Sequence, residues 1–179
     1  MPLSAIGLTL NMGYAGEPSV LNPQPITETH IVASGSANIP FGSPVIQNTD
    51  NTVKMADSTF TAANFGGIAS PTTKQLNNYT VPGTIGASGG FYAAGEAASI
   101  HKEGYFVVYV GFGASSVTAG GTVYVRKAVS SSVPSSAAIG QFEATADGST
   151  NVALTNVKFY TNHVDANGMA QVKMIYAIN

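Results

Sequence analysis

The residues of this chain that could do chemistry are few and widely separated. Its three histidines are His30, His101 and His163. His101-Lys102-Glu103 and His163-Val164-Asp165 each place a carboxylate two residues from an imidazole, on the same face of an extended strand. A protein zinc site needs three or four converging ligands, and the chain has no cysteine to contribute. We therefore interpret these pairs as polar residues of strand ends and loops, and we expect neither a metal nor another cofactor.

A serine nucleophile is a second candidate. Gly86-Ala87-Ser88-Gly89-Gly90 has the Gly-x-Ser-x-Gly spacing of a nucleophile elbow, but that elbow lies between a buried strand and a helix. The preceding Pro82-Gly83-Thr84-Ile85 is too short and broken to be such a strand. Glu96, Glu103 and Glu143 could supply a carboxylate pair for glycoside hydrolysis, although no pairing stands out. We predict a protein that is not an enzyme; a β-fold hydrolase that uses one of these groups is the enzymatic alternative.

The scarcity of charge is the main feature of the composition. Seven basic and nine acidic residues make only 9% of the chain charged, against about 25% in an ordinary soluble domain. The net charge of −2 gives no electrostatic footprint for nucleic acid or an anionic membrane, so we expect neither as a partner. Neutral polar surfaces repel one another weakly, which suits a protein packed against other proteins.

No targeting segment is evident. The first basic residue is Lys54, so Met1 to Leu10 lacks the positive region that precedes the apolar part of a secretory signal. The longest apolar run, Tyr105 to Val110, is far shorter than the ~20 residues that cross a bilayer. We expect a protein that is made in a cytoplasm and used without export.

The elements that must position these residues are predicted to be β-strands. Residues 105–110 and 122–126 are rich in β-branched and aromatic side chains. Residues 157–161 and 169–178 are predicted to form a hairpin, because Asp165-Ala166-Asn167-Gly168 tolerates the positive φ of a tight turn. Asp147-Gly148 predicts a similar hairpin between residues 141–144 and 152–154. The best candidate for a helical turn is Tyr92 to Ala98, which Gly95 interrupts.

The first half has weaker strand patterns, at residues 41–46, 52–55 and 65–69, followed by a loop over 70–90. Pro44-Val45-Ile46 before Gly66-Gly67-Ile68 is echoed by Val123-Tyr124-Val125 before Gly140-Gln141-Phe142. We predict an all-β fold, a compact barrel or sandwich over residues 26–179. The echo indicates two possible modules, 26–90 and 91–179, although chance similarity would explain it equally well.

Residues 1–25 are predicted to form an extended N-terminal arm. The arm has four prolines and a single charge, Glu17, whereas disordered tails are generally polar and charged. We expect it to be bound, along its own core, on a neighbouring copy or on another protein by strand addition, and we favour a neighbour. Its candidate interface residues are the apolar ones: Leu3, Ile6, Leu8, Leu10, Met12, Tyr14, Val20 and Leu21.

An ordered set of strand and turn motifs is distinctive. It comprises Asn22-Pro23, Phe41-Gly42-Ser43-Pro44-Val45, Phe65-Gly66-Gly67-Ile68-Ala69, Thr122-Val123-Tyr124-Val125-Arg126, Ile139-Gly140-Gln141-Phe142, Ala144-Thr145-Ala146-Asp147, Val157-Lys158-Phe159 and Gly168-Met169-Ala170-Gln171-Val172. From about Leu21 onward this set resembles the structural cement proteins of tailed phages, the capsid decoration family. The chain departs from the family at Gly121-Thr122, where an Asp-Pro-like pair is more usual, and in the expanded first 20 residues and 70–90 loop.

The resemblance implies a structural, non-enzymatic protein of the virion. Such a protein is made in the host cytoplasm, binds the outer surface of the capsid through the major capsid protein, and cements adjacent capsomers. Exposed strand edges with few charges invite pairing, so we expect them to be covered by copies of the chain or by the capsid. Because shells offer three-fold and two-fold positions, we favour a trimer, with a dimer as the alternative. The alternative function is a β-structured module of a tail fibre, spike or adhesin.

Overall fold

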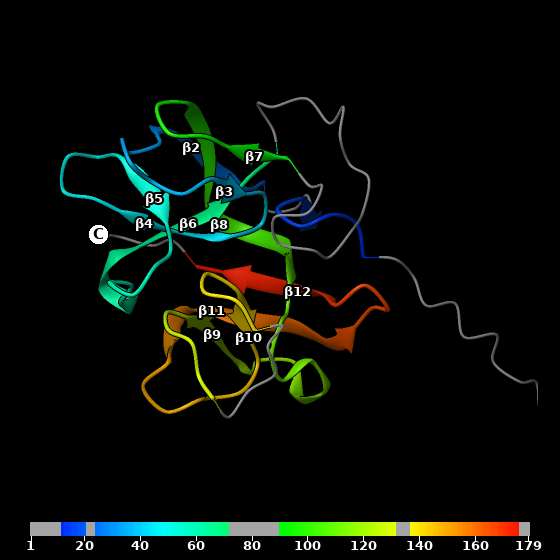
Figure 1. Ribbon diagram of the computed structural model, residues 1–179. Helices are drawn as coiled ribbons and strands as arrows, with labels where there is room; N and C mark the ends of the chain where they lie inside the picture. The colour runs from blue at the N-terminus through cyan, green and yellow to red at the C-terminus, as the bar shows by residue number, and fades with distance from the viewer. Residues whose placement is uncertain (1–11, 21–23, 72–89, 132–136, 176–179) are drawn as a thin grey trace, which may run out of the picture.

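The protein is almost entirely β-structure. The computed structural model describes residues 12–20, 24–71, 90–131 and 137–175, and over these ranges it contains no α-helix (Figure 1). The elements are β1 (Pro18–Val20), β2 (Ile26–Ile31), β3 (Ile39–Pro40), β4 (Pro44–Gln47), β5 (Val53–Met55), the 3-10 turn η1 (Ala62–Asn64), β6 (Phe65–Ala69), β7 (Phe91–Tyr92), β8 (Ala97–Tyr109), the 3-10 turn η2 (Ala114–Ser116), β9 (Thr122–Arg126), β10 (Phe142–Glu143), β11 (Asn151–Val164) and β12 (Met169–Met174). The predicted all-β class is confirmed.

Strand β8 connects the two halves of the molecule. Near its beginning His101 is flanked by β2 and β6, and near its end Phe106 is flanked by β1 and β12. The partners change at Gly104, whose φ of +134° lies where only glycine is comfortable. A Cβ there would lie 2.9 Å from the Phe106 ring and 3.2 Å from Pro25. Gly104 therefore permits the local backbone shape through which one strand serves both halves.

The ten-stranded sheet curls into a half-barrel, and each half nearly closes on itself (Figure 1). In the first half the order is β2-β8-β6-β4-β5, and Val53 of β5 makes a parallel bridge to Val32, just past β2. In the second half the order is β8-β12-β11-β9-β10, and Phe142 of β10 makes a parallel bridge to Val110, just past β8. These bridges cover backbone edges that would otherwise be open to pairing with other chains.

The two halves have the same topology when β1 and the separate two-stranded sheet of β3 and β7 are set aside. In each half the first strand pairs with the fifth, the fifth with the fourth, the fourth with the second and the second with the third. Strand β8 is the fifth strand of one half and the first of the other. The echo in the sequence matched β4 with β9 correctly. It was wrong to match β6 with β10, because β6 corresponds to β11 in strand order. The division at 26–90 and 91–179 stays a prediction.

Two apolar cores lie on opposite faces of the first-half strands. The larger core joins the halves, and it includes Phe65 of β6, Phe106 of β8 and Phe159 of β11. The smaller core includes Val45 of β4 and Ile100 of β8, with Tyr92 of β7 among the residues that cover them. Strands β4 and β6 carry residues of both cores. This explains why their side chains are buried on both faces and lack a clean alternation.

The strands predicted for the second half are present, although β12 ends at Met174 and not at residue 178, and residues 176–178 lie outside the described residues. Strands β11 and β12 form the predicted hairpin through the turn at Asp165 to Gly168, and Gly168 has a φ of +78°. The chain does turn at Asp147-Gly148, but the strands on either side are not a hairpin, because β9 lies between β10 and β11. The predicted helical turn at Tyr92 to Ala98 is wrong: it is a tight turn between β7 and β8.

A buried network of ion pairs and hydrogen bonds connects strands of the second half. Arg126 and Glu143 are both fully buried and form a two-pronged ion pair, Nε with Oε1 and Nη2 with Oε2, the latter at 3.0 Å. Arg126 Nη2 also donates to Asp147 Oδ2 at 3.0 Å, and Asn151 Nδ2 donates to Glu143 Oε2 at 2.7 Å. The network links β9, β10 and β11 to the turn at residue 147.

Removing one member of this network tests its role. Glu143→Ala leaves the Arg126 guanidinium buried without its main partner, and we expect a loss of about 3–5 kcal/mol in the free energy of unfolding, measured by urea denaturation. The control is Lys54→Ala, which breaks the more exposed pair of Lys54 with Asp57 (2.8 Å) and should cost at most about 1 kcal/mol. Equal losses in the two variants would contradict the assigned role.

Candidate functional site

The described part of the arm, residues 12–20, lies along its own domain; we call it the N-terminal strap. Gly16 N donates to Val107 O at 2.8 Å, and Val107 N donates to Glu17 O at 2.9 Å. Pro18 and Val20 of β1 then pair with Phe106 and Tyr105 of β8. The strap thus adds a strand to the second half of β8 (Figure 1).

Gly16 sets how closely the strap can approach the domain. Its φ is +85°, and a Cβ at this position would lie 2.5 Å from Ala69 O and 2.8 Å from Gly42 N. Any other residue would therefore clash with backbone atoms as well as strain the turn. The strap and the domain meet here through backbone atoms. Such a contact cannot be predicted from the apolar residues of the sequence or from their spacing.

Asp165 ties the start of the strap to the β11–β12 turn. Its Oδ2 accepts a hydrogen bond from Met12 N at 3.1 Å, while Oδ1 accepts from Asn167 N at 2.8 Å and Met169 N at 3.0 Å. The buried Asp165 carboxylate therefore stabilises the predicted turn and also binds Met12, the residue that follows residues 1–11. The sequence singled out Asp165 for its turn and for its distance from His163, and gave no sign of this second contact.

The buried side chain of His101 contacts the strap. Its Nε2 lies 2.9 Å from Gly16 O and its Nδ1 lies 2.8 Å from Thr27 Oγ1, while the ring stacks on Phe106 with centroids 4.2 Å apart. Because a carbonyl can only accept, Nε2 carries the proton and Nδ1 accepts from the threonine hydroxyl. Burial lowers the pKa of His101 to about 4, so the ring is neutral at pH 7. His101 is a structural residue and not a metal ligand in this arrangement.

The candidate interface residues divide into three groups. Met12 and Tyr14 lie in the strap and are half-buried. Val20 lies in β1, where its backbone pairs with Tyr105. The remaining five lie outside the described residues: Leu3, Ile6, Leu8, Leu10 and Leu21. Their contact with a neighbour stays a prediction. The structure shows where residues 1–11 join the domain, at Met12.

The groups proposed for chemistry do not converge where the structure describes them. His30 contacts Glu28 Oε2 at 3.1 Å and Asn51 O at 3.1 Å, whereas His163 is exposed on β11. Over residues 12–20, 24–71, 90–131 and 137–175, no three His, Asp or Glu side chains are grouped to hold a metal ion. Glu143 is held in the Arg126 pair. Ser88 lies outside the described residues.

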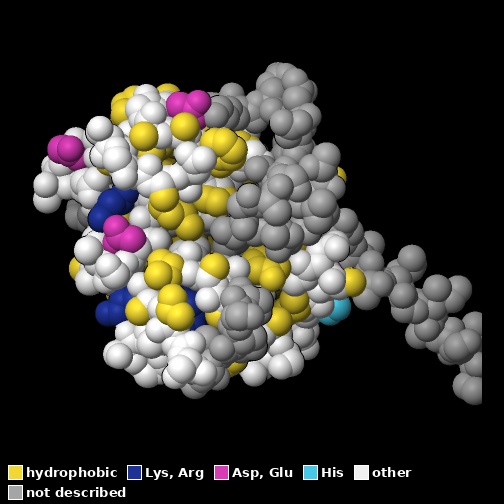
Figure 2. All heavy atoms as spheres, viewed as in Figure 1, with side chains coloured by type: hydrophobic (Ala, Val, Ile, Leu, Met, Phe, Trp, Pro, Cys, Tyr) yellow, Lys and Arg dark blue, Asp and Glu magenta, His cyan; other side chains and the backbone are white. Residues whose placement is uncertain are grey.

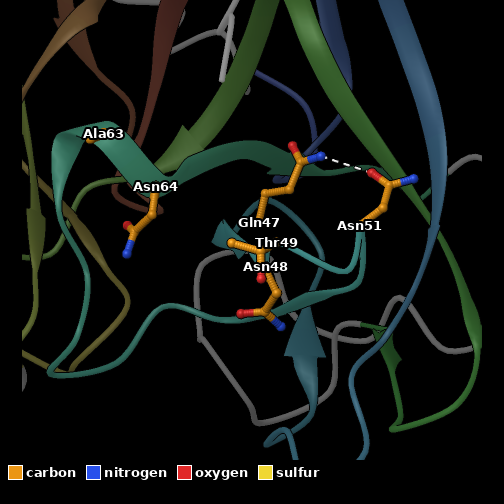
Figure 3. A pocket seen from close by; sticks show the side chains of 6 residues that line it. All are labelled: Gln47, Asn48, Thr49, Asn51, Ala63 and Asn64. Carbon is orange, nitrogen blue, oxygen red and sulfur yellow. Dashed lines mark hydrogen bonds between the residues drawn. The ribbon is translucent and has the colours of Figure 1, made fainter.

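A polar pocket of about 370 Å³ lies beside β4 and η1 (Figure 3). Its lining residues are mostly amides: Gln47, Asn48, Thr49, Asn51, Ala63 and Asn64. Gln47 Nε2 donates to Asn51 Oδ1 at 2.9 Å, and Asn64 Oδ1 accepts from Thr61 N at 2.8 Å. These amides satisfy one another and the adjacent backbone, and the lining contains no acid or base. The pocket offers no catalytic group.

A buried lysine stands next to this pocket. Lys102 Nζ donates to Gln47 Oε1 at 2.7 Å and lies 3.6 Å from Glu28 Oε2. Burial lowers the pKa of Lys102, and the nearby Glu28 carboxylate opposes that shift. Since Lys102 is almost fully covered, it links β8 to β2 and β4 and does not present an amine to a substrate.

The chain belongs to a family of phage structural proteins. The family described as structural cement protein (E217 gp24/Pam3 gp6) matches residues 2–175, nearly the whole chain. Among solved structures, a chain from the capsid of Myoviridae phage XM1 is similar, with 16% sequence identity, a TM-score of 0.64 and coverage of 95% of this chain and 94% of that chain. At that identity the similarity shows a shared fold. No curated protein matches the chain.

The family assignment confirms the resemblance drawn from the ordered strand motifs, and it gives the chain a structural role connected with the phage capsid. The described residues contain no helix long and apolar enough to cross a membrane.

The burial of His101 predicts a dependence of stability on pH. An imidazole has a pKa of 6.5 when free and about 4 here, so below pH 6.5 the unfolded chain binds more protons than the folded one. The free energy of unfolding should therefore fall as the pH is lowered from about 6.5 towards 4, by about 2 kcal/mol between pH 7 and 5. Urea denaturation at the two pH values measures the difference.

The control for this prediction is the exposed histidine. His163→Gln should keep the full loss between pH 7 and 5, whereas His101→Gln should reduce it. A loss that is the same in both variants would show that His101 is not its source.

Proposed function

We propose that this protein binds the outer surface of a phage capsid and cements adjacent capsomers, without enzymatic activity. The observation that carries the proposal is the family match over residues 2–175. The major capsid protein is the proposed partner, neither nucleic acid nor membrane is bound, and the protein reaches the shell from the host cytoplasm in which it is made. A trimer is the favoured oligomer and a dimer the alternative, because these match the symmetry axes of a shell.

The surface of the domain supports recognition by apolar contact. Figure 2 shows hydrophobic side chains in several groups across one face, with few charged side chains between them. The large apolar side chains exposed over the whole described surface are Ile26, Ile31, Phe91, Val129, Ile139, Tyr160 and Ile175. Burial of apolar area contributes about 25 cal/mol per Å², and a sparse set of charges adds little desolvation cost on docking.

Several weak contacts made by one oligomer would together be enough to hold it on the shell. If one oligomer contacts several capsid subunits, each further contact forms at a high effective concentration, and the combined affinity exceeds that of any single contact. Such bridging would hold adjacent capsomers together against outward pressure from packaged DNA.

Residues 1–11 are proposed to supply part of the cementing contact. They contain Leu3, Ile6, Leu8 and Leu10 and carry no charged side chain. They continue from Met12, which Asp165 fixes to the domain surface. A segment anchored at one end loses less entropy on binding than a free peptide would, so a neighbouring copy or the capsid can capture it by strand addition.

The function is tested by adding the purified protein to shells that lack it. We expect the protein to sediment with the shells and to raise the temperature at which they release DNA. Sedimentation without any gain in heat resistance would contradict cementing. Failure to sediment with shells of any expansion state would contradict capsid binding.

Two truncations separate the roles of the arm. Deleting residues 1–11 should leave Tm within about 2 °C of the full chain and weaken shell binding at least about tenfold. Deleting residues 1–20 should lower Tm as well, because it removes the strap's bonds to Val107 and the His101 contact with Gly16. Undiminished binding after removal of residues 1–11 would contradict the proposed role of the arm.

A further inference from the structure

One face of the second half gathers aromatic rings and lysines on three adjacent strands. It consists of Tyr105 on β8, Lys158 and Tyr160 on β11, Lys173 on β12, and Ile175 just beyond β12; we call it the tyrosine–lysine face. Cross-strand partners share a face, and Lys173 is the partner of both Tyr105 and Lys158. The neighbours of Lys173 in β12, Val172 and Met174, are buried in the core, so Lys173 points outward.

The rings of this face are packed together and yet remain open to solvent. Tyr105 and Tyr160 meet edge to face with centroids 4.6 Å apart, and Lys173 Nζ lies 5.7 Å from the centroid of Tyr105. Tyr160 is 46% exposed and Ile175 is 59% exposed. Rigid, half-exposed tyrosines lose little entropy when they are covered, which is why such residues dominate binding hot spots.

The charges of this face are unbalanced. Lys158 and Lys173 are backbone partners across β11 and β12, and Lys173 extends toward Tyr105 on β8. Lys158 Nζ donates to Thr122 Oγ1 at 3.1 Å, but neither lysine forms an ion pair with a carboxylate of the described residues. By contrast, Lys54, Lys102 and Arg126 each lie within 4 Å of a carboxylate.

We propose that the tyrosine–lysine face docks an acidic segment on the surface of the protein partner, so that this inference rests on the proposed capsid binding. A carboxylate beside Lys173 supplies the opposite charge that the described residues do not give this lysine. An adjacent apolar side chain of the partner covers Tyr160 and Ile175. The opposite charges also orient the approaching molecules, which speeds association and fixes the register of docking.

A protein partner fits this face better than a nucleic acid does. Two lysines are too few to follow a phosphate backbone, whose binding depends on many neutralised charges. The Tyr105 ring meets the Tyr160 ring edge to face and has Lys173 near it, so the two tyrosines do not form a pair of open parallel platforms for bases.

Reversing one charge tests the proposal, and the Tm of the variant shows whether it still folds. Lys173→Glu puts opposite charges across β11 and β12, so we expect Tm to stay the same or rise by about 1–3 °C while shell binding falls at least about tenfold at low salt. Lys127→Glu changes the net charge equally, lies outside the face, and is the matched control. Tyr160→Ala is compared in the same way with Ile31→Ala, which shortens another exposed apolar side chain.

The outcomes are distinguishable in one co-sedimentation experiment with shells over a range of NaCl concentrations. Weaker binding by Lys173→Glu and Tyr160→Ala, with both controls close to wild type, supports the face. Wild-type affinity in these two variants, or equal weakening by Lys127→Glu, overturns it while leaving capsid binding intact. If the unaltered chain fails to bind any shell, the proposed function itself fails, and the inference fails with it.

Discussion

The architecture depends on a single strand that is shared by both halves of the ten-stranded sheet. Strand β8 is thirteen residues long and hydrogen-bonds β2 and β6 at one end and β1 and β12 at the other. Phe106 contributes to the core that joins the halves, and its ring also stacks on the His101 that holds the strap. Neither half has a complete set of strands without β8. The two halves share one strand and one core.

The shortage of charge has a second consequence, which the composition alone does not show. Several of the few charges are spent inside the molecule, including Arg126, Glu143 and Lys102. These buried charges are satisfied within the molecule and are not available to a partner. In a chain with so few charges, Lys158 and Lys173 on β11 and β12, which have no carboxylate partner among the described residues, are a specific feature. In the proposed docking, apolar contact would provide the area for binding, and a small number of charges would provide the register.

The sequence predicted the parts of the fold that depend on local patterns. Alternation in residues 169–174 and the Asn167-Gly168 turn identified the β11–β12 hairpin, because both are properties of neighbouring residues. The insertion of β9 between β10 and β11 could not be predicted, since it depends on pairing between distant segments. Packing of the strap on its own domain was one of the alternatives that the sequence left open, and it could not be selected for the same reason. The contacts of Gly16 with Gly42 and with His101 are tertiary contacts. The tyrosine–lysine face likewise combines residues from three strands.

The most direct test of the central claim is a cryo-EM map of the mature particle, resolved well enough to fit the domain. We expect density for this fold on the outer surface of the shell, repeated across it and spanning the boundary between adjacent capsomers. Density confined to the tail or to fibres, density inside the shell, or a shell without this chain would show that the protein does not cement the capsid.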